Sequence, residues 1–297
     1  MSVERVVVRA PATIANLGPG FDCLGLALAW HNEASVERDG AGGLSITVAG
    51  EGADRIPRDE TNFVARAIAS VRGDAGGLRI HMTNAIPFGR GFGSSASAIV
   101  AGLVAARALD GADWDPGELV AAAAAIEGHA DNVAPCVHGG ATVIAGTAVM
   151  PLDAPPFEAI ACVAPMAMST EAARKALPAT VPFADAAANA GRAALLAASL
   201  ARGDAGLLMD ATEDVLHQPA RFGLAPDSGR LVAALRGAGI AAFLAGAGPS
   251  VAALVALGDA GRAETEARRL APQGWDVRRV AIDATGTSVV ERVPSGS

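Results

Sequence analysis

The sequence has very little lysine and no tyrosine: one of its 297 residues is lysine, Lys175, and tyrosine is absent. Two widespread ATP-binding motifs require lysine, because a Walker A loop contains one and a protein kinase pairs a strand lysine with a helix glutamate. Lys175 lies in no glycine-rich segment. The sequence therefore excludes both classes, and any nucleotide would be held by backbone amides, serine hydroxyls and magnesium.

Cysteine is also scarce, and its pattern is uninformative for metal or redox chemistry. The three cysteines, Cys23, Cys136 and Cys162, are widely spaced and form no CxxC pair. An odd number of separated cysteines is typical of a reducing compartment. The first residues also lack the charged segment, apolar run and cleavage site of a signal peptide. We therefore expect a cytoplasmic protein with buried thiols.

Positive charge is in deficit. The formal net charge is −8, the pI is about 5.1, and 51% of residues are hydrophobic against 18% charged. An acidic chain is a poor partner for nucleic acid, since phosphate backbones recruit basic surfaces. The high hydrophobic fraction excludes a disordered chain. An anionic substrate must therefore be held in a local pocket rather than on a basic face.

One long uncharged stretch, residues 237–258, could be mistaken for a membrane span. Gly246, Gly248 and Pro249 interrupt it, and the two halves have the length of strands. We therefore predict a strand, a turn and a second strand in a core, and no membrane association.

The remaining pattern mixes helices and strands without strict alternation, which favours an α+β fold. Strands are predicted at 3–9, 23–30, 44–48 and 78–83. Helices are predicted at 61–71 with Thr61 as cap, at 94–109, at 116–126 behind Asp115, and near 186–201, 228–236 and 260–270. The proline-rich passage at 155–156 suggests two domains, 1–154 and 155–297, with the active site in the cleft between them.

The richest segment is PFGRGFGSSAS at 87–97. Three alternating glycines let backbone N–H groups turn toward one point, and the two serines open a helix whose unpaired amides attract anions. The segment therefore predicts a phosphate cradle. Taken alone, it also fits an ordinary strand-to-helix loop with a serine cap.

Three further segments carry polar residues beside rigid turns. APATIANLGPGFDCLG at 10–25 flanks a glycine-proline turn with Asn16 and Asp22, and GAGPS at 246–250 fits a tight hairpin turn. IEGHADNVAPCVHGG at 126–140 places Glu127, Asp131 and Asn132 after a helix. Structural turns and a charged helix end explain each segment separately, and His129 alone favours a solvent-facing position.

Together and in this order, the four segments resemble the galacto-, homoserine, mevalonate and phosphomevalonate kinase (GHMP kinase) superfamily. GFGSSA at 91–96 resembles its second motif and GAGP at 246–249 its third, while ANLGPGFD and EGHADNVAP are similar to the homoserine kinase branch. The resemblance spans nearly the whole chain. It implies a two-domain α+β fold and a transferase of threonine biosynthesis that phosphorylates L-homoserine with ATP and Mg²⁺, with a homodimer as the expected assembly.

The resemblance also implies residue roles. Ser95 and Glu127 would bind magnesium, and Asn132 would stabilise the transferring phosphoryl group. Asn16 and Asp22 would orient the acceptor, with Thr170 assisting. STEAAR at 169–174 and HQPAR at 217–221 resemble substrate segments, so Arg174 and Arg221 would hold the α-carboxylate, as guanidinium forks suit carboxylates. The ATP site would comprise Pro87, Gly89, Arg90, Gly91, Phe92, Gly93, Ser94, Ser95, Ala96 and Asn62.

The sequence departs from the pattern at three positions. Ala245 stands where many relatives have serine, Phe92 replaces the common leucine, and Arg90 sits at the loop rim. Two alternatives stay open. A GHMP kinase for another alcohol, mevalonate or a sugar, explains the loop but leaves the paired arginines unexplained. A ligand sensor on the same scaffold should lose its magnesium ligands, yet Ser95 and Glu127 are present.

Overall fold

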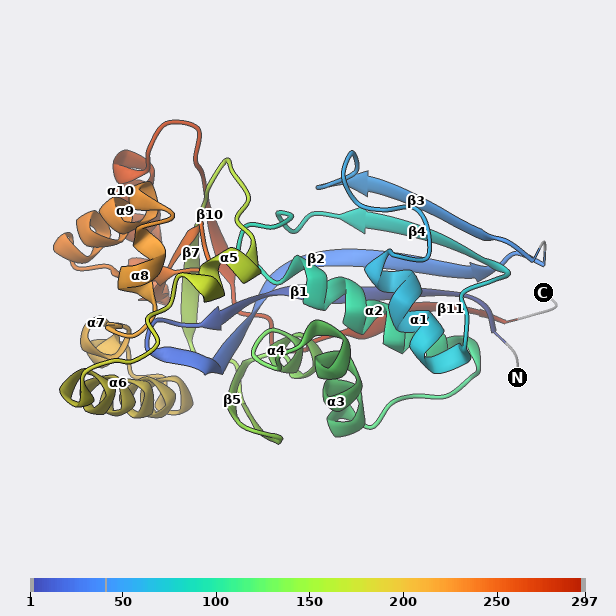
Figure 1. Ribbon diagram of the computed structural model, residues 1–297, viewed down its shortest axis with the longest axis horizontal. Helices are drawn as coiled ribbons and strands as arrows, with labels where there is room; N and C mark the ends of the chain where they lie inside the picture. The colour runs from blue at the N-terminus through green and yellow to red at the C-terminus, as the bar shows by residue number, and fades with distance from the viewer. Residues whose placement is uncertain (1–2, 41, 295–297) are drawn as a thin grey trace.

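Two sheets carry the fold (Figure 1), and the computed structural model describes residues 3–40 and 42–294. The first sheet is organised on a long antiparallel pair, β1 (Val3–Asn16) and β2 (Gly20–Arg38). Both strands run well past their predicted ends, so the glycine-proline turn shrinks to residues 17–19. Pro11 lies inside β1, where it lacks an N–H, and the register with β2 shifts after it.

The first sheet has seven strands in the order β11-β1-β2-β4-β3, with β5 and β6 joined beside β2. β3 and β4 pair in parallel, and the other pairs are antiparallel. The remaining strands are β3 (Leu44–Gly50), β4 (Leu78–Asn84), β5 (Ala141–Ala145), β6 (Ala148–Leu152) and β11 (Ser288–Pro294). Burial alternates strictly along β4, as its alternating sequence predicts for a half-buried strand.

Helices α1 to α4 gather on one face of this sheet (Figure 1), and their apolar side chains form one core with β1 to β4. They are α1 (Phe63–Arg72), α2 (Ser94–Leu109), α3 (Pro116–Glu127) and α4 (Val133–His138). α2 has its predicted bounds, and Asp115 caps α3 as predicted. Thr61 as the cap of α1 was wrong: Asn62 accepts the Val64 N–H at 2.9 Å.

The second sheet contains four antiparallel strands in the order β10-β7-β9-β8. Their bounds are β7 (Phe157–Val163), β8 (Ala241–Leu244), β9 (Val251–Ala256) and β10 (Asp276–Ala281). The uncharged stretch 237–258 thus forms β8, a turn and β9, which confirms the strand prediction. None of the helices within residues 3–40 and 42–294 has the length and apolarity needed to cross a membrane.

Residues 155–294 of the second half also contain six helices and two short 3₁₀ turns. Its helices are α5 (Thr170–Lys175), α6 (Phe183–Arg202), α7 (Leu208–Ala211), α8 (Gln218–Phe222), α9 (Pro226–Gly237) and α10 (Ala260–Leu270), and the 3₁₀ turns are Ala205–Leu207 and Leu257–Asp259. α9 and α10 share a core with one face of the second sheet. The other face packs against α6 and the β1–β2 end.

This last core joins the two halves, because side chains of both sheets meet in it. Ile14 and Leu26 from the first sheet and Ala161 and Phe243 from the second belong to the same buried cluster. The chain then crosses back, since β11 pairs antiparallel with β1. The α+β prediction is confirmed, whereas the division at residue 154 stays a prediction, as sheet membership does not follow it after residue 287.

We predict that Asp115→Ala lowers the free energy of unfolding by about 1 kcal/mol, because the N–H groups of Gly117 and Glu118 lose their cap. Urea denaturation followed by circular dichroism measures the change. Asp115→Asn, which retains an acceptor oxygen, is the control and should stay within about 0.5 kcal/mol of the wild type. An equal loss in both variants would show that the cap contributes little.

Candidate active site

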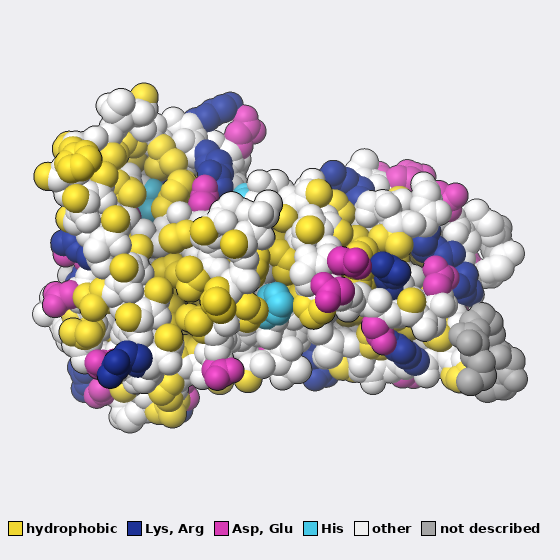
Figure 2. Space-filling view, turned by 90° about the horizontal axis from the view of Figure 1, so that it is seen from below, with side chains coloured by type: hydrophobic (Ala, Val, Ile, Leu, Met, Phe, Trp, Pro, Cys, Tyr) yellow, Lys and Arg dark blue, Asp and Glu magenta, His cyan; other side chains and the backbone are white. Residues whose placement is uncertain are grey.

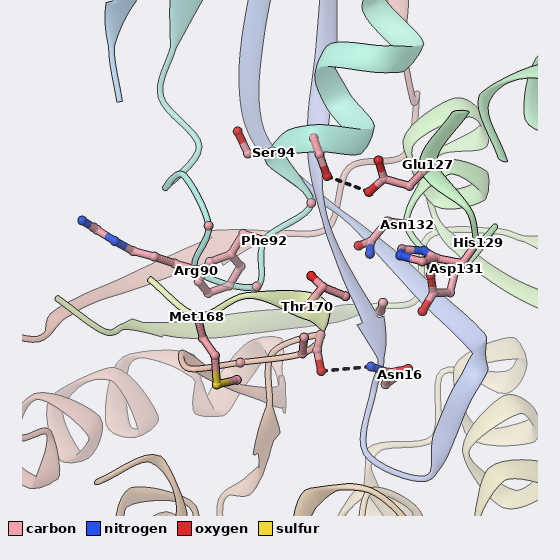
Figure 3. A pocket seen from close by; sticks show the side chains of 18 of the residues that line it. Asn16, Arg90, Phe92, Ser94, Glu127, His129, Asp131, Asn132, Met168 and Thr170 are labelled. Atoms are coloured by element: carbon pink, nitrogen blue, oxygen red, sulfur yellow. Dashed lines mark hydrogen bonds and ion pairs between the residues drawn. The ribbon is translucent and has the colours of Figure 1, made fainter. Parts of the chain in front are cut away.

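A cavity of about 290 Å³ lies between the two halves of the chain, and Figure 3 shows the side chains that line it. Its walls come from segments far apart in sequence: the β1–β2 turn, the loop 87–93, the starts of α2 and α4, the end of α3, α5, α8 and the turn 246–248. The long core that joins the sheets therefore fixes the distances between these walls.

The loop 87–93 presents backbone to this cavity. Gly89, Gly91 and Gly93 all have positive φ, at 69°, 90° and 67°, which other residues adopt only at a cost. Gly93 is the N-cap of α2, and among the described residues no side chain caps that helix. The alternative of a serine-capped loop is therefore wrong. The first amides of α2 are left for a ligand, beside the positive end of a 16-residue helix.

Close packing holds the loop in place. A Cβ at Gly93 would lie 1.9 Å from Thr13 Oγ1, and one at Gly91 would lie 2.2 Å from the Ala245 carbonyl oxygen. The Thr13 N–H also donates to the Phe92 carbonyl at 3.1 Å. The Phe92 ring is fully buried and packs against Trp30, so its departure from the common leucine serves the core.

Ser95 and Glu127 face each other at the base of the loop (Figure 3). Ser95 Oγ donates to Glu127 Oε1 at 2.6 Å, from the first turn of α2 to the last residue of α3. Burial raises the pKa of Glu127, although the hydrogen bond from Ser95 opposes this shift. A carboxylate held in a buried place without a cation beside it is destabilised, and a bound cation would relieve that cost.

Asn132 lies beside this pair at the start of α4. Its side-chain oxygen accepts from Thr13 Oγ1 at 2.8 Å, so the NH₂ group is the end that can donate to an anion in the cavity. Thr13 belongs to β1, so the orientation of the Asn132 amide is held by a strand of the sheet and not by the loop that contains Asn132. Figure 3 shows the amide between Glu127 and Thr170.

His129 and Asp131 also line the cavity, and the solvent-facing interpretation of His129 was wrong. His129 Nδ1 lies 2.7 Å from Asp131 Oδ1, and the imidazole is 20% exposed. The Asp131 carboxylate raises the pKa of His129 above its usual range. The sequence contained a signal for this position, since Glu127, His129 and Asp131 alternate in EGHADN. The short connection between α3 and α4 brings all three residues to the cavity.

The β1–β2 turn supplies the opposite wall. Asn16, Leu17 and Asp22 all have positive φ, an unusual conformation for side-chain-bearing residues that surrounding contacts must hold. Asn16 Oδ1 accepts the Asp22 N–H at 3.0 Å, and Asn16 Nδ2 donates to the Gly246 carbonyl at 2.9 Å. The turn is thus fixed both internally and against the second half.

Arg174 and Asp22 form a bidentate pair across the cavity. The two guanidinium nitrogens of Arg174 donate to the two carboxylate oxygens of Asp22 at 3.1 and 2.8 Å. Asp22 raises the pKa of Arg174. Because these side chains are 40% and 39% exposed, solvent screens the pair and a ligand can replace either partner.

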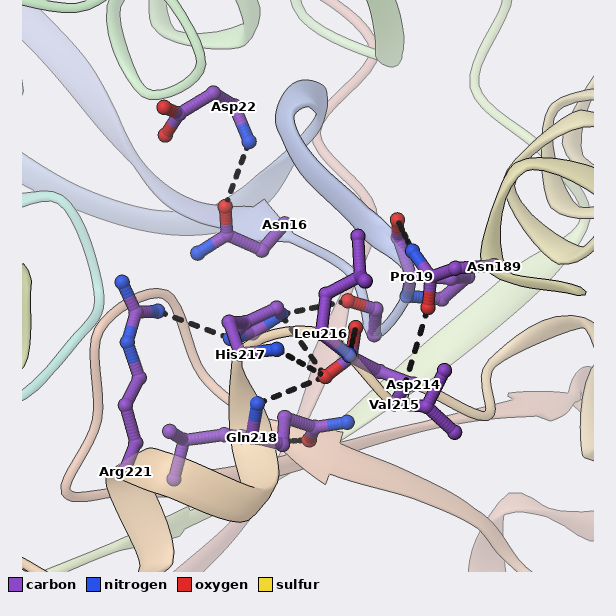
Figure 4. A network of polar contacts seen from close by, with 12 residues as sticks. Asn16, Pro19, Asp22, Asn189, Asp214, Val215, Leu216, His217, Gln218 and Arg221 are labelled. Atoms are coloured by element: carbon purple, nitrogen blue, oxygen red, sulfur yellow. Dashed lines mark hydrogen bonds and ion pairs between the residues drawn. The ribbon is translucent and has the colours of Figure 1, made fainter. Parts of the chain in front are cut away.

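Arg221 is the largest fully buried side chain of the structure and also lines the cavity. Nη1 donates to His217 Nδ1 at 3.1 Å (Figure 4) and also to the Gly246 carbonyl at 3.2 Å. Burial lowers the pKa of Arg221, and the Arg174 guanidinium lowers it further. The Phe21 ring lies 5.6 and 5.3 Å from the Arg174 and Arg221 guanidinium carbons. Two cations converging on one cavity favour an anionic ligand there.

Sequence comparisons agree with this geometry. The GHMP kinase N-terminal domain matches residues 62–140, and the GHMP kinase C-terminal domain matches residues 196–273. The homoserine kinase of Streptomyces avermitilis is 47% identical, covering 96% of this chain and 95% of its own. That of Streptomyces coelicolor is 44% identical, covering 96% and 94%. The chain belongs to the homoserine kinase family of the GHMP kinases.

Solved structures support the same family. The homoserine kinase of Cytophaga hutchinsonii superposes with a TM-score of 0.87 at 30% identity, covering 97% of this chain and 98% of its own. A mevalonate diphosphate decarboxylase from Staphylococcus aureus has a TM-score of 0.70 at 18% identity, covering 97% and 98%. The second likeness shows the fold alone.

The structure brings nearly all of the residues predicted from the homoserine kinase resemblance to this cavity. Those that line it are Asn16, Asp22, Pro87, Gly89, Arg90, Gly91, Phe92, Gly93, Ser94, Ser95, Glu127, Asn132, Thr170, Arg174 and Arg221. Ala96 is fully buried in the core instead. Phe21, whose ring lies near both arginines, was not predicted as a site residue, although ANLGPGFD contains it next to Asp22.

Asn62 lies outside the main cavity and lines a neighbouring one of about 200 Å³, whose walls also include Phe63, Phe88 and Met82. Its side chain caps α1 and donates to the Pro57 carbonyl at 2.8 Å. The two cavities share the walls at Phe63, Phe88, Ser94 and Ser95. A mostly apolar compartment therefore adjoins the phosphate loop.

We predict that Gly93→Ala weakens ATP binding by about tenfold or more, because the added methyl group strains the positive φ and collides with Thr13 Oγ1. Isothermal titration with ATP measures the loss. Gly191→Ala in α6 is a matched control, since a Cβ there meets nothing within 4 Å. Equal ATP affinity in Gly93→Ala and the wild type would show that the loop tolerates the displacement.

Proposed function

We propose that this protein transfers the γ-phosphoryl group of ATP to the side-chain hydroxyl of L-homoserine, giving ADP and O-phospho-L-homoserine, a step of threonine biosynthesis. The single observation that carries the proposal is one cavity in which uncapped helix amides and a Ser95–Glu127 pair face two arginines and Asp22. The first set suits a triphosphate with its metal ion, and the second suits a free amino acid.

The triphosphate binds along the loop 87–93 and the first turn of α2. Backbone N–H groups from Gly91 to Ser95 donate to its oxygens, and the positive end of α2 favours the negative charge. Arg90 at the rim adds a cation, which matters in a chain that has no lysine in this loop. The neighbouring cavity at Asn62 and Phe63 has the apolar walls that an adenine ring requires.

Magnesium fits the Ser95–Glu127 pair. A hydroxyl and a carboxylate oxygen only 2.6 Å apart are hard oxygen donors that already converge on one place. Within residues 3–40 and 42–294 no cluster of three or more His, Cys, Asp or Glu side chains could hold a metal ion. Mg²⁺ binds through one or two carboxylates together with phosphate oxygens and water, so Glu127 beside the phosphate loop supplies the kind of protein ligand it uses. Bound there, the ion neutralises charge that develops on the phosphates.

The acceptor replaces the Arg174–Asp22 ion pair with its own two charges. The α-ammonium group binds Asp22, while the α-carboxylate binds Arg174 and the buried Arg221. Each charged hydrogen bond contributes about 1.5–3 kcal/mol, enough to select an amino acid over a simple alcohol. Asn16 and Thr170 orient the hydroxyl end toward the phosphates.

The transfer itself requires positioning more than proton chemistry. The hydroxyl oxygen of homoserine forms a bond to the γ-phosphorus as the bond to the β–γ bridging oxygen breaks, through a loose transition state. ADP leaves with the electron pair of the broken bond, and the hydroxyl proton is released to solvent. The Asn132 amide donates to the transferring group, and the Thr13 contact holds it ready. Orientation of this kind lowers the barrier because both reactants are bound in line.

The two rival functions are disfavoured by particular contacts. A sugar offers no anion to the converging Arg174 and Arg221, and mevalonate, which has a carboxylate, has no ammonium group to pair with Asp22. A sensor without transferase activity has no use for Asn132 held beside the Ser95–Glu127 pair. Both rivals would share the phosphate loop.

We further infer a cytoplasmic homodimer that binds neither nucleic acid nor membrane. The net charge of −8 and the three free thiols support the location and the absence of nucleic acid. Figure 2 shows hydrophobic side chains gathered over the second half of the molecule, and Phe183, Met150 and Met166 are 89%, 63% and 60% exposed. Such exposure supports a partner, and light scattering after gel filtration tests whether it is a second copy.

We predict that the purified protein, mixed with MgATP and L-homoserine, produces a phosphate monoester resonance of O-phosphohomoserine in the ³¹P NMR spectrum. Mevalonate and galactose, tested in parallel, should give no phosphorylated product because they lack the ammonium group that Asp22 binds. ADP formation that requires mevalonate or galactose instead would reject homoserine as the substrate. Binding of homoserine without turnover would favour the sensor.

We predict that Glu127→Gln lowers kcat by about 10³-fold, equivalent to about 4 kcal/mol of barrier, and raises the Mg²⁺ concentration needed for half activity. The amide retains the size of the side chain but loses the charge that the cation requires. Glu118→Gln, an exposed change on the same helix, should retain wild-type turnover. Turnover of Glu127→Gln within a few-fold of wild type would remove Glu127 from the metal site.

A further inference from the structure

A buried histidine lies directly behind the acceptor-binding arginine. His217 is 1% exposed and does not line the cavity, yet it contacts both walls of the acceptor site. Its Nε2 lies 2.8 Å from the Gly18 carbonyl oxygen in the β1–β2 turn, and its Nδ1 lies 3.1 Å from Arg221 Nη1 (Figure 4). One imidazole thus links the turn that carries Asn16 and Asp22 to Arg221.

The partners of the ring fix its protonation state. A carbonyl oxygen only accepts and a guanidinium only donates, so Nε2 carries the hydrogen and Nδ1 offers its lone pair. This is the neutral imidazole with the hydrogen on Nε2. Protonation would add a hydrogen on Nδ1, which would face an N–H of Arg221 donor to donor and cation to cation.

The charged groups around His217 come from three elements. Arg221 on α8 opposes a positive imidazole, whereas Asp214 before α8 and Asp22 on β2 favour one. Asp214 Oδ2 is 3.7 Å from Nε2, but that oxygen already accepts the N–H groups of His217 and Gln218 at 3.0 and 2.8 Å. Burial is the largest influence and lowers the pKa of His217 below its usual 6.5.

Arg221 depends on this neutral acceptor. Within the described part of the chain its Nε has no hydrogen-bond partner, and Nη1 is held by His217 Nδ1 and the Gly246 carbonyl. The Gly246 oxygen is shared, because Asn16 Nδ2 also donates to it. The imidazole is therefore the acceptor that fixes the direction of the guanidinium, leaving its remaining N–H groups for a carboxylate.

We propose that neutral His217 is a positioning residue that aims Arg221 at the carboxylate of the acceptor, so that acceptor affinity falls when the imidazole becomes protonated. The inference rests on the proposed function, since it takes the acceptor to be an amino acid. His217 touches no substrate and acts only through Arg221 and the turn.

The direction of the pH effect follows from the lowered pKa. Above about pH 6.5 the imidazole is neutral in the folded and the unfolded chain. As the pH falls below 6.5, the unfolded chain binds a proton before the folded one, so stability declines until the folded pKa is passed. Below the folded pKa, KM for homoserine rises about tenfold per pH unit, because the binding-competent neutral form is depleted.

The test compares two substitutions that each retain one half of the imidazole. His217→Asn places an amide oxygen near the Nδ1 position and retains an acceptor for Arg221. His217→Gln places an amide nitrogen near Nε2, retaining the donor to Gly18 but losing that acceptor. We expect His217→Gln to raise KM for L-homoserine about ten- to hundredfold with KM for ATP unchanged, and His217→Asn to stay within about threefold of the wild type.

A carboxylate-free acceptor separates positioning from general damage. For 3-aminopropan-1-ol, assayed as substrate or as competitive inhibitor, Arg221 has no anion to bind, so His217→Gln should stay within about twofold of the wild type. Arg221→Met, which removes the guanidinium, sets the lowest affinity for homoserine expected in this series. In the wild type, the ratio of KM for homoserine to the KM or inhibition constant for 3-aminopropan-1-ol should rise as the pH falls. This rise should persist in His129→Gln and be absent in His217→Asn.

Two results would overturn the proposal. One is that His217→Gln weakens binding of homoserine and of 3-aminopropan-1-ol equally. The other is that the rise of the KM ratio at acid pH disappears in His129→Gln and persists in His217→Asn. Circular dichroism melts identify a variant that fails to fold, and the wild-type pH profile then decides alone: a ratio that stays constant from about pH 8 down to the lowest pH at which the wild type remains folded counts against His217. Absence of homoserine phosphorylation by the wild type would instead reject the proposed function.

Discussion

The start of α2, left without a side-chain cap, is the constraint on which the site depends. Exposed amides and a helix dipole provide positive potential without a cationic side chain, which suits a chain with a single lysine. The arrangement requires Gly93 in the left-handed region directly against Thr13. Thr13 in turn holds Asn132. β1 thereby positions both the phosphate-binding loop and the Asn132 amide beside it.

The acceptor side depends on a second strained element, the β1–β2 turn. Its positive-φ residues Asn16, Leu17 and Asp22 would relax in an isolated hairpin, so contacts from the second half must hold them. Buried Asn189 donates to the Pro19 carbonyl at 2.8 Å, and His217 contacts the Gly18 carbonyl. The same contacts bring α6 and α8 onto the turn. Folding of the second half and assembly of the acceptor site are therefore one event.

Several charged side chains of the site are paired with one another. Asp22 pairs with Arg174, Ser95 donates to Glu127, and His129 contacts Asp131. Among residues 3–40 and 42–294, Arg221 has no such carboxylate contact, and it donates to neutral acceptors instead. An ion pair that is exposed can be exchanged for the two charges of an amino acid at little cost, whereas a buried guanidinium gains most from a new anion.

Local pattern was sufficient for several elements. Helix α2, the Asp115 cap and the strand–turn–strand of residues 237–258 follow from spacing, capping chemistry and length, which act within a few residues. Pattern failed where long-range packing overrode it. The strand predicted at 3–9 was too short, because pairing with β2 carries β1 on through Pro11 to Asn16. Thr61 and Asn62 are both good caps, and only the fold selects between them.

By itself the sequence determined the kind of chemistry: without a lysine in the loop, alternating glycines before a serine-rich helix start can hold phosphate through main-chain amides, serine hydroxyls and a metal ion. Family resemblance then named the residues around it. Tertiary structure alone decided that Asn62 lies in the adjoining cavity and that His217 stands behind Arg221. Those relations join segments up to 200 residues apart, such as Gly18 and His217 with a separation of 199, and no local pattern encodes contacts at that range.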